Sequence, residues 1–232
     1  MSAAAWLAFW DAPHLMYVNA RHREVHYRLI AEQIATFVPS RDARVLDYGC
    51  GNALHADVVA AAAGTLFLCD GAPRLRAELA RRFAGNAKIR VVAPEEVERL
   101  PDGTLDLVVL HSVAQYLTQD ELAALLTLFR RLLKADGMLL ISDIVPPNVS
   151  AAADAVALLR FGGNNGFLCG AVTGLARTVV SPYWRLRSRY GLTRYSQAAI
   201  TDKLAACGFT AQRTAQNIGH NWMRMAFTAR PR

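Results

Sequence analysis

Two acids and two glycines early in the chain have the spacing of a ligand-binding loop. Asp47, Gly49 and Gly51 follow the apolar run 44–46, and Asp70 ends a second apolar run 23 residues after Asp47. Glycines at the end of a strand let backbone N–H groups approach a ligand at the start of the next helix. In a doubly wound sheet, an acid that ends the second strand faces the ribose hydroxyls of an adenosine ligand. The pattern predicts an adenosine site, and a plain structural turn with a helix-capping acid is the alternative interpretation.

The elements that must position these residues alternate regularly along the chain. Helical spacing or apolar runs predict strands at 44–47, 65–69, 89–92, 105–110 and 138–143, and helices at 22–37, 55–63, 72–83, 118–134 and 196–207. A turn is expected at 135–137, and two closing strands at 209–215 and 222–229 form an antiparallel hairpin. Continuous apolar strands separated by helices indicate a parallel sheet covered on both faces.

The expected fold is therefore α/β, a doubly wound, Rossmann-like sheet of seven mostly parallel strands with an antiparallel last strand. At 232 residues the chain fits one domain, 1–232. Its expected parts are an N-terminal helical cap (1–40), a cofactor-binding core (41–150), a helical lid (151–195) and a terminal helix with a β-hairpin (196–232).

These motifs resemble those of the class I S-adenosylmethionine-dependent methyltransferases of the small-molecule type. The segment 45–53 (VLDYGCGNA) is similar to their first motif, and 68–70 to their second-strand acid. The segments 100–106 and 133–139 resemble the approaches to their fourth and fifth strands, so the resemblance covers about residues 40–145. It implies S-adenosylmethionine as the cofactor and methyl transfer as the reaction.

Two other functions are weighed against methyl transfer. A nicotinamide oxidoreductase would need G-x-G-x-x-G, which requires glycine where the chain has Leu54. A non-catalytic module that binds S-adenosylmethionine is the other alternative, because Ala93 and Pro94 stand where the family often has an acid for the adenine amino group.

The resemblance also implies roles for individual residues. Gly49 and Gly51 would lie against the methionine part of the cofactor, Asp47 would hold its amino group, and Asp70 would take both ribose hydroxyls.

Further cofactor contacts are expected from three other places in the chain. His111 ends the fourth strand, in the region that usually lines the cofactor next to the reacting methyl. Glu95 or Glu96 could replace the missing adenine acid, and Tyr17, Arg21 or His22 could reach the site from the N-terminal cap.

The histidines near expected strand ends are candidate general bases. Open parallel sheets place their sites at these ends, which selects His111 and His220, with Asp143 as a further base. His22 and His26 lie one helical turn apart, but they lack a third ligand and the H-E-x-x-H pattern, so we predict no metal site.

The charge of the chain is divided unevenly. Residues 1–150 carry a net −2 and residues 151–232 a net +9, of the total of +7. The basic part predicts an acidic substrate, a membrane surface or nucleic acid as partner. No nucleic-acid-binding module is present, which favours a small-molecule acceptor and leaves a peripheral membrane contact through the lid open.

Composition adds a substrate class and a compartment. Tyr183, Trp184 and Tyr190 in the lid would suit an apolar or aromatic acceptor. The first residues lack the basic stretch of a signal peptide, and the four cysteines lack metal-ligand spacing, so a cytoplasmic protein is expected. The acceptor atom and the oligomeric state stay open.

Overall fold

The computed structural model describes all of the chain except residues 1–2, 13–16, 179–180, 182–184, 186 and 190. Tyr183, Trp184 and Tyr190, the aromatic residues expected to suit the acceptor, therefore lie outside the described residues.

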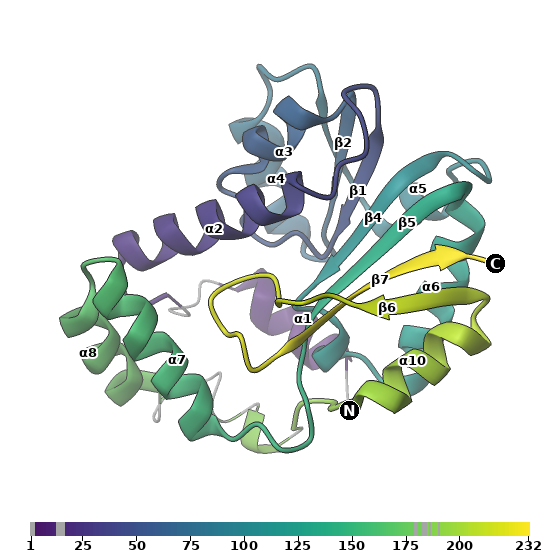
Figure 1. Ribbon diagram of the computed structural model, residues 1–232. Helices are drawn as coiled ribbons and strands as arrows, with labels where there is room; N and C mark the ends of the chain where they lie inside the picture. The colour runs from purple at the N-terminus through teal and green to yellow at the C-terminus, as the bar shows by residue number, and fades with distance from the viewer. Residues whose placement is uncertain (1–2, 13–16, 179–180, 182–184, 186, 190) are drawn as a thin grey trace.

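A seven-stranded sheet with the order β3-β2-β1-β4-β5-β7-β6 forms the centre of the molecule (Figure 1). Its strands are β1 (Arg44–Tyr48), β2 (Thr65–Cys69), β3 (Ile89–Val92), β4 (Leu105–His111), β5 (Leu133–Ile144), β6 (Phe209–Arg213) and β7 (Met225–Pro231). Strands β1 to β5 pair in parallel, whereas β7 runs antiparallel to both β5 and β6. The expected doubly wound sheet with an antiparallel last strand is confirmed.

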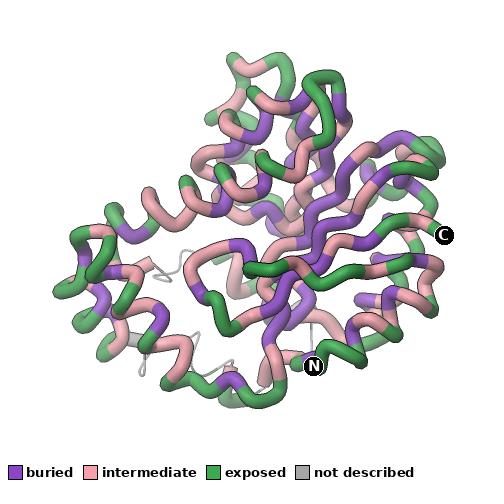
Figure 2. The backbone as a smooth tube through the Cα atoms, viewed as in Figure 1, coloured by how far each residue is buried: buried purple, intermediate pink, exposed green. Residues whose placement is uncertain are grey.

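Helices cover both faces of this sheet because successive strand residues point to opposite sides. On one face Leu46, Val108 and Ile141 pack beneath α5 (Pro94–Glu98), α6 (Gln119–Leu132) and α10 (Gln197–Ala206). On the other face Val45 and Val109 pack beneath α2 (Ala20–Ala35), α3 (Ala56–Ala62) and α4 (Pro73–Arg82). Figure 2 shows the buried backbone concentrated in the central strands.

The lid helices and one end of α2 extend beyond the sheet (Figure 1). The cap consists of α1 (Ala3–Asp11) and α2, and the lid contains α7 (Ala151–Asn164) and α8 (Leu168–Thr178). Asn19 and Ser150 cap α2 and α7 through their side-chain oxygens. Gly170 and Gly174, one turn apart on α8, leave room for Asn19 and Val18 at the start of α2. Cap and lid are thus in direct contact.

The structure differs from the sequence prediction in two local details. Residues 135–137 do not form a turn: they belong to β5, where the pairing with β4 shifts register between Leu105 and Leu107. The last strand begins at Met225 rather than at Trp222, whose side chain is 65% exposed. No helix in the described part of the chain is long and apolar enough to cross a membrane.

Candidate active site

The glycine loop after β1 requires its glycines. Gly49 and Gly51 have φ of +75° and +58°, in the left-handed region that favours glycine. A Cβ atom at Gly49 would collide with the side chain of Val113, and one at Gly51 would lie 3.1 Å from the Tyr27 hydroxyl. The loop is anchored to the end of β2, because the Gly49 N–H donates to the Cys69 carbonyl at 2.8 Å.

The two predicted acids meet beside this loop. Asp70 accepts hydrogen bonds from the backbone N–H of Gly51 at 3.1 Å and from that of Ala72 at 2.9 Å. Burial and the nearby Asp70 carboxyl raise the pKa of Asp47 to about 7. Burial also raises the pKa of Asp70, although its two backbone donors oppose the change. Because both pKa values are raised, the two carboxyl groups do not readily ionise at the same time. A ligand with a positive charge and hydroxyl donors would stabilise their ionised forms.

The ends of β4 and β5 hold two residues in strained backbone conformations. Ser112 and Asp143 have φ of +59° and +62°, and the Ser112 hydroxyl donates to the Asp143 carboxylate at 2.8 Å. Such outliers concentrate at functional sites, where the surrounding structure holds them in place. Next to them, His111 Nδ1 lies 2.9 Å from the Ser142 hydroxyl oxygen. This bond fixes the His111 ring and leaves Nε2 as its other exchangeable nitrogen.

His220, the second candidate base, lies in the loop between β6 and β7. Its ring stacks on Phe161 of α7, with the ring centroids 4.7 Å apart and the planes 14° apart. Burial lowers its pKa, and Asp143 partly opposes this change. Gly219 places the loop against His111, since a Cβ atom at Gly219 would lie 3.9 Å from His111 Cε1. The fold thus brings the two histidines to the same edge of the sheet.

The two cap residues Tyr17 and Arg21 contact different parts of the structure. Tyr17 donates its hydroxyl to the Tyr27 hydroxyl at 2.7 Å, and Tyr27 in turn accepts from the Asn52 N–H at 3.1 Å. Tyr17 is therefore one residue away from the glycine loop. Arg21 instead donates to the Asn165 carbonyl of the lid at 3.2 Å, so the structure does not bring it to the loop.

The two glutamates proposed for the adenine position have different surroundings. Glu96 accepts from the Ala93 N–H at 2.7 Å and closes the N-terminus of α5. Glu95 is exposed; burial raises the pKa of Tyr48 at the end of β1, and the charge of Glu95 adds slightly to this rise. Of the pair, Glu95 has the freer carboxylate on the side of the strand ends.

The sequence prediction missed a network that joins the core to the lid. Arg224 donates to Asp143 of β5 at 2.9 Å and to Asp154 of α7 at 3.1 Å, and Arg187 also pairs with Asp154 at 3.1 Å. Asn217 receives the Asp143 N–H at 2.9 Å. Burial alone would raise the pKa of Asp143, but Arg224, together with His111 and Ser112, holds that pKa below its usual value. The surplus of arginine over acid in residues 151–232 was the only sequence signal of this network.

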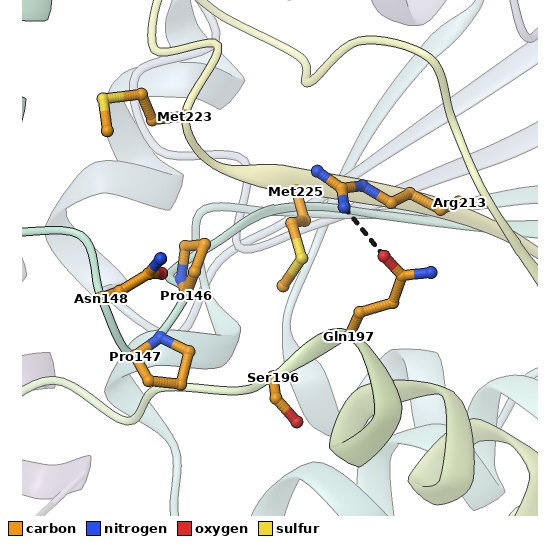
Figure 3. Close-up of a pocket in the computed structure, with 8 residues that line it drawn as sticks. All are labelled: Pro146, Pro147, Asn148, Ser196, Gln197, Arg213, Met223 and Met225. Atoms are coloured by element: carbon orange, nitrogen blue, oxygen red, sulfur yellow. Dashed lines mark hydrogen bonds between the residues drawn. The ribbon is translucent and has the colours of Figure 1, made fainter.

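Other features nearby lie apart from these residues. A recess between the β5–α7 connection and the start of α10 is lined by none of the predicted site residues; those around it are Pro146, Pro147, Asn148, Ser196, Gln197, Arg213, Met223 and Met225 (Figure 3). In the described part of the chain, no three His, Cys, Asp or Glu side chains are arranged to hold a metal ion.

Residues 46–141 match a family described as a methyltransferase domain. No curated protein matches the chain.

Solved structures share the fold at low sequence identity. The DhpI–SAH complex superimposes with a TM-score of 0.63 at 14% identity, covering 99% of this chain and 96% of that one. The N-methyltransferase NodS from Bradyrhizobium japonicum WM9, in complex with S-adenosyl-L-homocysteine, gives 0.60 at 16% identity, over 100% and 99%. Magnesium protoporphyrin IX methyltransferase (ChlM) from Synechocystis PCC 6803 with bound SAH gives 0.59 at 15% identity, over 99% and 94%.

The fold, with the acids and glycines at the ends of β1 and β2, indicates the class of the protein. The antiparallel β7 between β5 and β6 distinguishes the sheet from the nicotinamide-binding fold, whose strand order is 3-2-1-4-5-6. Residues 46–141 therefore form a methyltransferase domain, so the chain is an enzyme, and its sheet has the Rossmann-like strand order shared with S-adenosylmethionine-dependent methyltransferases. The domain match supports neither the oxidoreductase nor the non-catalytic alternative.

Proposed function

We propose that this enzyme transfers the methyl group of S-adenosylmethionine to a small, partly apolar acceptor. The observation that carries the proposal is the pairing of Asp47 and Asp70 beside a glycine loop, with His111 and His220 across the same edge of the sheet. The bound cofactor supplies a methyl group on a positively charged sulfur.

The cofactor would be held mainly by four residues. Asp47 has no hydrogen-bonding cation among the described residues and would bind the amino group of the methionine part. Asp70 keeps lone pairs beyond its two backbone bonds and would accept from both ribose hydroxyls. Gly49 and Gly51 would allow backbone N–H groups to approach the ligand closely. Glu95 is the remaining candidate for the adenine amino group.

The acceptor would bind between the cap, the lid and the loop that carries His220. If its nucleophile is a hydroxyl group, the proton must leave, and a neutral imidazole can take it. Burial lowers the pKa of both His111 and His220, so both are neutral at pH 7 and able to accept a proton. Asp143 does not suit the role of base, because Arg224 already neutralises it.

A thermal-shift assay tests the cofactor assignment. S-adenosylmethionine and its demethylated product should each raise the melting temperature of the full chain, and NADPH should not. At a ligand concentration of 100 Kd the stabilisation is about 2.7 kcal/mol. Stabilisation by NADPH alone would overturn the proposal, and formation of the demethylated product in the presence of acceptor mixtures would establish turnover.

We also propose that the lid contacts an anionic membrane surface. Val156, Leu168 and Val172 of α7 and α8 are exposed, at 46%, 47% and 54%. Arg160 and Arg177 are exposed on the same two helices. Apolar and basic side chains together on exposed helices suit an interfacial contact.

Sedimentation with vesicles of phosphatidylserine and phosphatidylcholine tests this contact. Replacing Arg160, Arg177 and Arg185 with Gln should reduce binding at about 0.15 M salt, where screening acts over about 8 Å. The control replaces three exposed arginines outside the lid, in residues 41–150: Arg41, Arg81 and Arg90. Equal sedimentation of both triple variants and the natural chain would reject the contact.

A further inference from the structure

Three imidazole rings from distant parts of the sequence meet beneath the lid. His22 and His26 lie on α2, and His220 lies in the loop between β6 and β7. Their ring centroids are separated by 5.8 Å (His22–His26), 5.7 Å (His26–His220) and 6.4 Å (His22–His220). Figure 1 shows the β6–β7 loop extending from the sheet toward α2 and α7.

Each of these rings has a buried nitrogen without a hydrogen-bond partner in the described structure: His22 Nε2, His26 Nδ1 and His220 Nδ1. The other nitrogen of His22 accepts the Val18 N–H at 3.4 Å. In the neutral ring, Nε2 of His22 must then carry the hydrogen and is a donor that lacks an acceptor. A buried unpaired donor costs stability, and with two further unpartnered ring nitrogens beside it the cluster needs an explanation outside the folding of the chain.

Flat apolar side chains border the cluster. Phe167 stacks on His22 with the centroids 4.9 Å apart and the planes 19° apart, and Phe161 stacks on His220. The two phenylalanines also meet each other edge to face at 5.5 Å. The surroundings therefore combine ring faces with a few polar nitrogens, the usual composition of a site for a small organic ligand.

The cluster carries no net charge at neutral pH. Burial lowers the pKa of His22 to about 4 and that of His26 well below its usual value, and the mutual repulsion of the rings adds to this. The nearby acids Asp143 and Asp154 are both bound by Arg224. Because Arg224 neutralises both carboxylates, neither would attract a cationic ligand.

The cluster is also continuous with the cofactor side. The Tyr17 ring lies 5.6 Å from each of His22 and His26, and its hydroxyl reaches the glycine loop through Tyr27. Gly219 places the neighbouring His220 backbone beside His111.

We infer that His22, His26 and His220, with Phe161 and Phe167, bind the methyl acceptor, and that this acceptor is an uncharged planar aromatic molecule bearing a hydroxyl or carbonyl oxygen. The His22 Nε2–H would donate to that oxygen, and the phenylalanine rings would pack on the aromatic plane. This inference rests on the proposed function, because it takes the neighbouring loop to hold the methyl donor.

Histidine ring-nitrogen NMR on the full chain, saturated with S-adenosylhomocysteine, tests the inference. The probes are 2-naphthol and 2-naphthylmethylamine, which have the same plane but differ in charge at pH 7. Naphthol should shift the nitrogens of His22, His26 and His220 and leave His55, which pairs with Glu24, unchanged. The cationic amine should bind at least about tenfold more weakly, because no free carboxylate receives it.

Two variants separate a binding role from a structural one. His22→Leu should weaken 2-naphthol about tenfold. It should change the melting temperature little, because it removes an unpaired buried donor together with the long hydrogen bond from the Val18 N–H. His22→Gln keeps a donor and should recover most of the affinity, and His55→Gln should match the natural chain.

Naphthol that leaves the three imidazoles unshifted, or an amine that binds as well as naphthol, would overturn the inference. Calorimetry of S-adenosylhomocysteine, run separately, reports on the proposed function. If S-adenosylhomocysteine does not bind but naphthol still shifts the three imidazoles, the cofactor assignment is rejected and the aromatic site is not.

Discussion

The two sides of the proposed site, one for the cofactor and one for the acceptor, are made of different chemical groups. The cofactor side uses backbone N–H groups and two acids supplied by a short stretch of sequence, Asp47 to Ala72, at the ends of β1 and β2. The acceptor side uses side-chain rings and an arginine bridge drawn from α2, α7 and the β6–β7 loop. Backbone conformation therefore controls the first side, and side-chain packing controls the second.

Gly49→Val should give the largest effect and act on the cofactor side alone. The added side chain must occupy the space of Val113 at a residue whose φ is +75°. We expect no measurable binding of S-adenosylhomocysteine by calorimetry, with a circular dichroism spectrum that still shows the sheet. Gly85→Val is the matched control, because nothing lies within 4 Å of a Cβ atom there. Equal binding by both variants would contradict the role of the loop.

Asp70→Ala should weaken the same ligand by about 1.5–3 kcal/mol, since it removes charge-assisted hydrogen bonds to both ribose hydroxyls. Asp202→Ala, which removes an exposed acid on α10, should change nothing. Unchanged calorimetric affinity in Asp70→Ala would show that this acid does not receive the ribose.

Arg224→Gln should affect the acceptor side instead. It leaves Asp143 and Asp154, both largely buried, without their shared cation. We expect a loss of about 2–3 kcal/mol in the free energy of unfolding, measured by urea denaturation. The affinity for S-adenosylhomocysteine should stay within twofold of the natural value, and a parallel loss of that affinity would mean that the two sides are not independent.

The smallest expected effect is a pH dependence of cofactor binding. The pKa of Asp47 is about 7, and an ammonium group binds only its ionised form. Affinity should therefore fall as the pH decreases through 7, by roughly fivefold between pH 7 and pH 6. Asp47→Asn should bind more weakly and show no such dependence in calorimetry over that range. A natural chain with constant affinity would place the ammonium away from Asp47.

The sequence predicted the first side far better than the second, for a physical reason. The glycine loop, Asp70 and the capping box from Thr118 to Glu121 are local patterns, and the structure contains the backbone each one requires. The stacking of His220 on Phe161 joins residues about sixty positions apart, and no periodicity in either segment indicates it.

Two further details of the structure were not predicted from the sequence. The turn expected at 135–137 is absorbed into β5 because the strand pairing accommodates a register shift. Arg21, expected at the cofactor, contacts the lid. This contact depends on how α2 is oriented relative to the sheet, which the sequence does not indicate.

The bridge made by Arg224 limits how the enzyme could acquire a new substrate. Its three members lie on β5, on α7 and just before β7, and Arg187 adds a fourth attachment. A lid exchanged with a relative as the single segment 151–195 would leave Arg224 and Asp143 facing a foreign surface. An exchange that keeps these ion pairs must therefore carry the loop 214–224 together with the lid, so the two segments form one structural module although 18 residues of chain separate them.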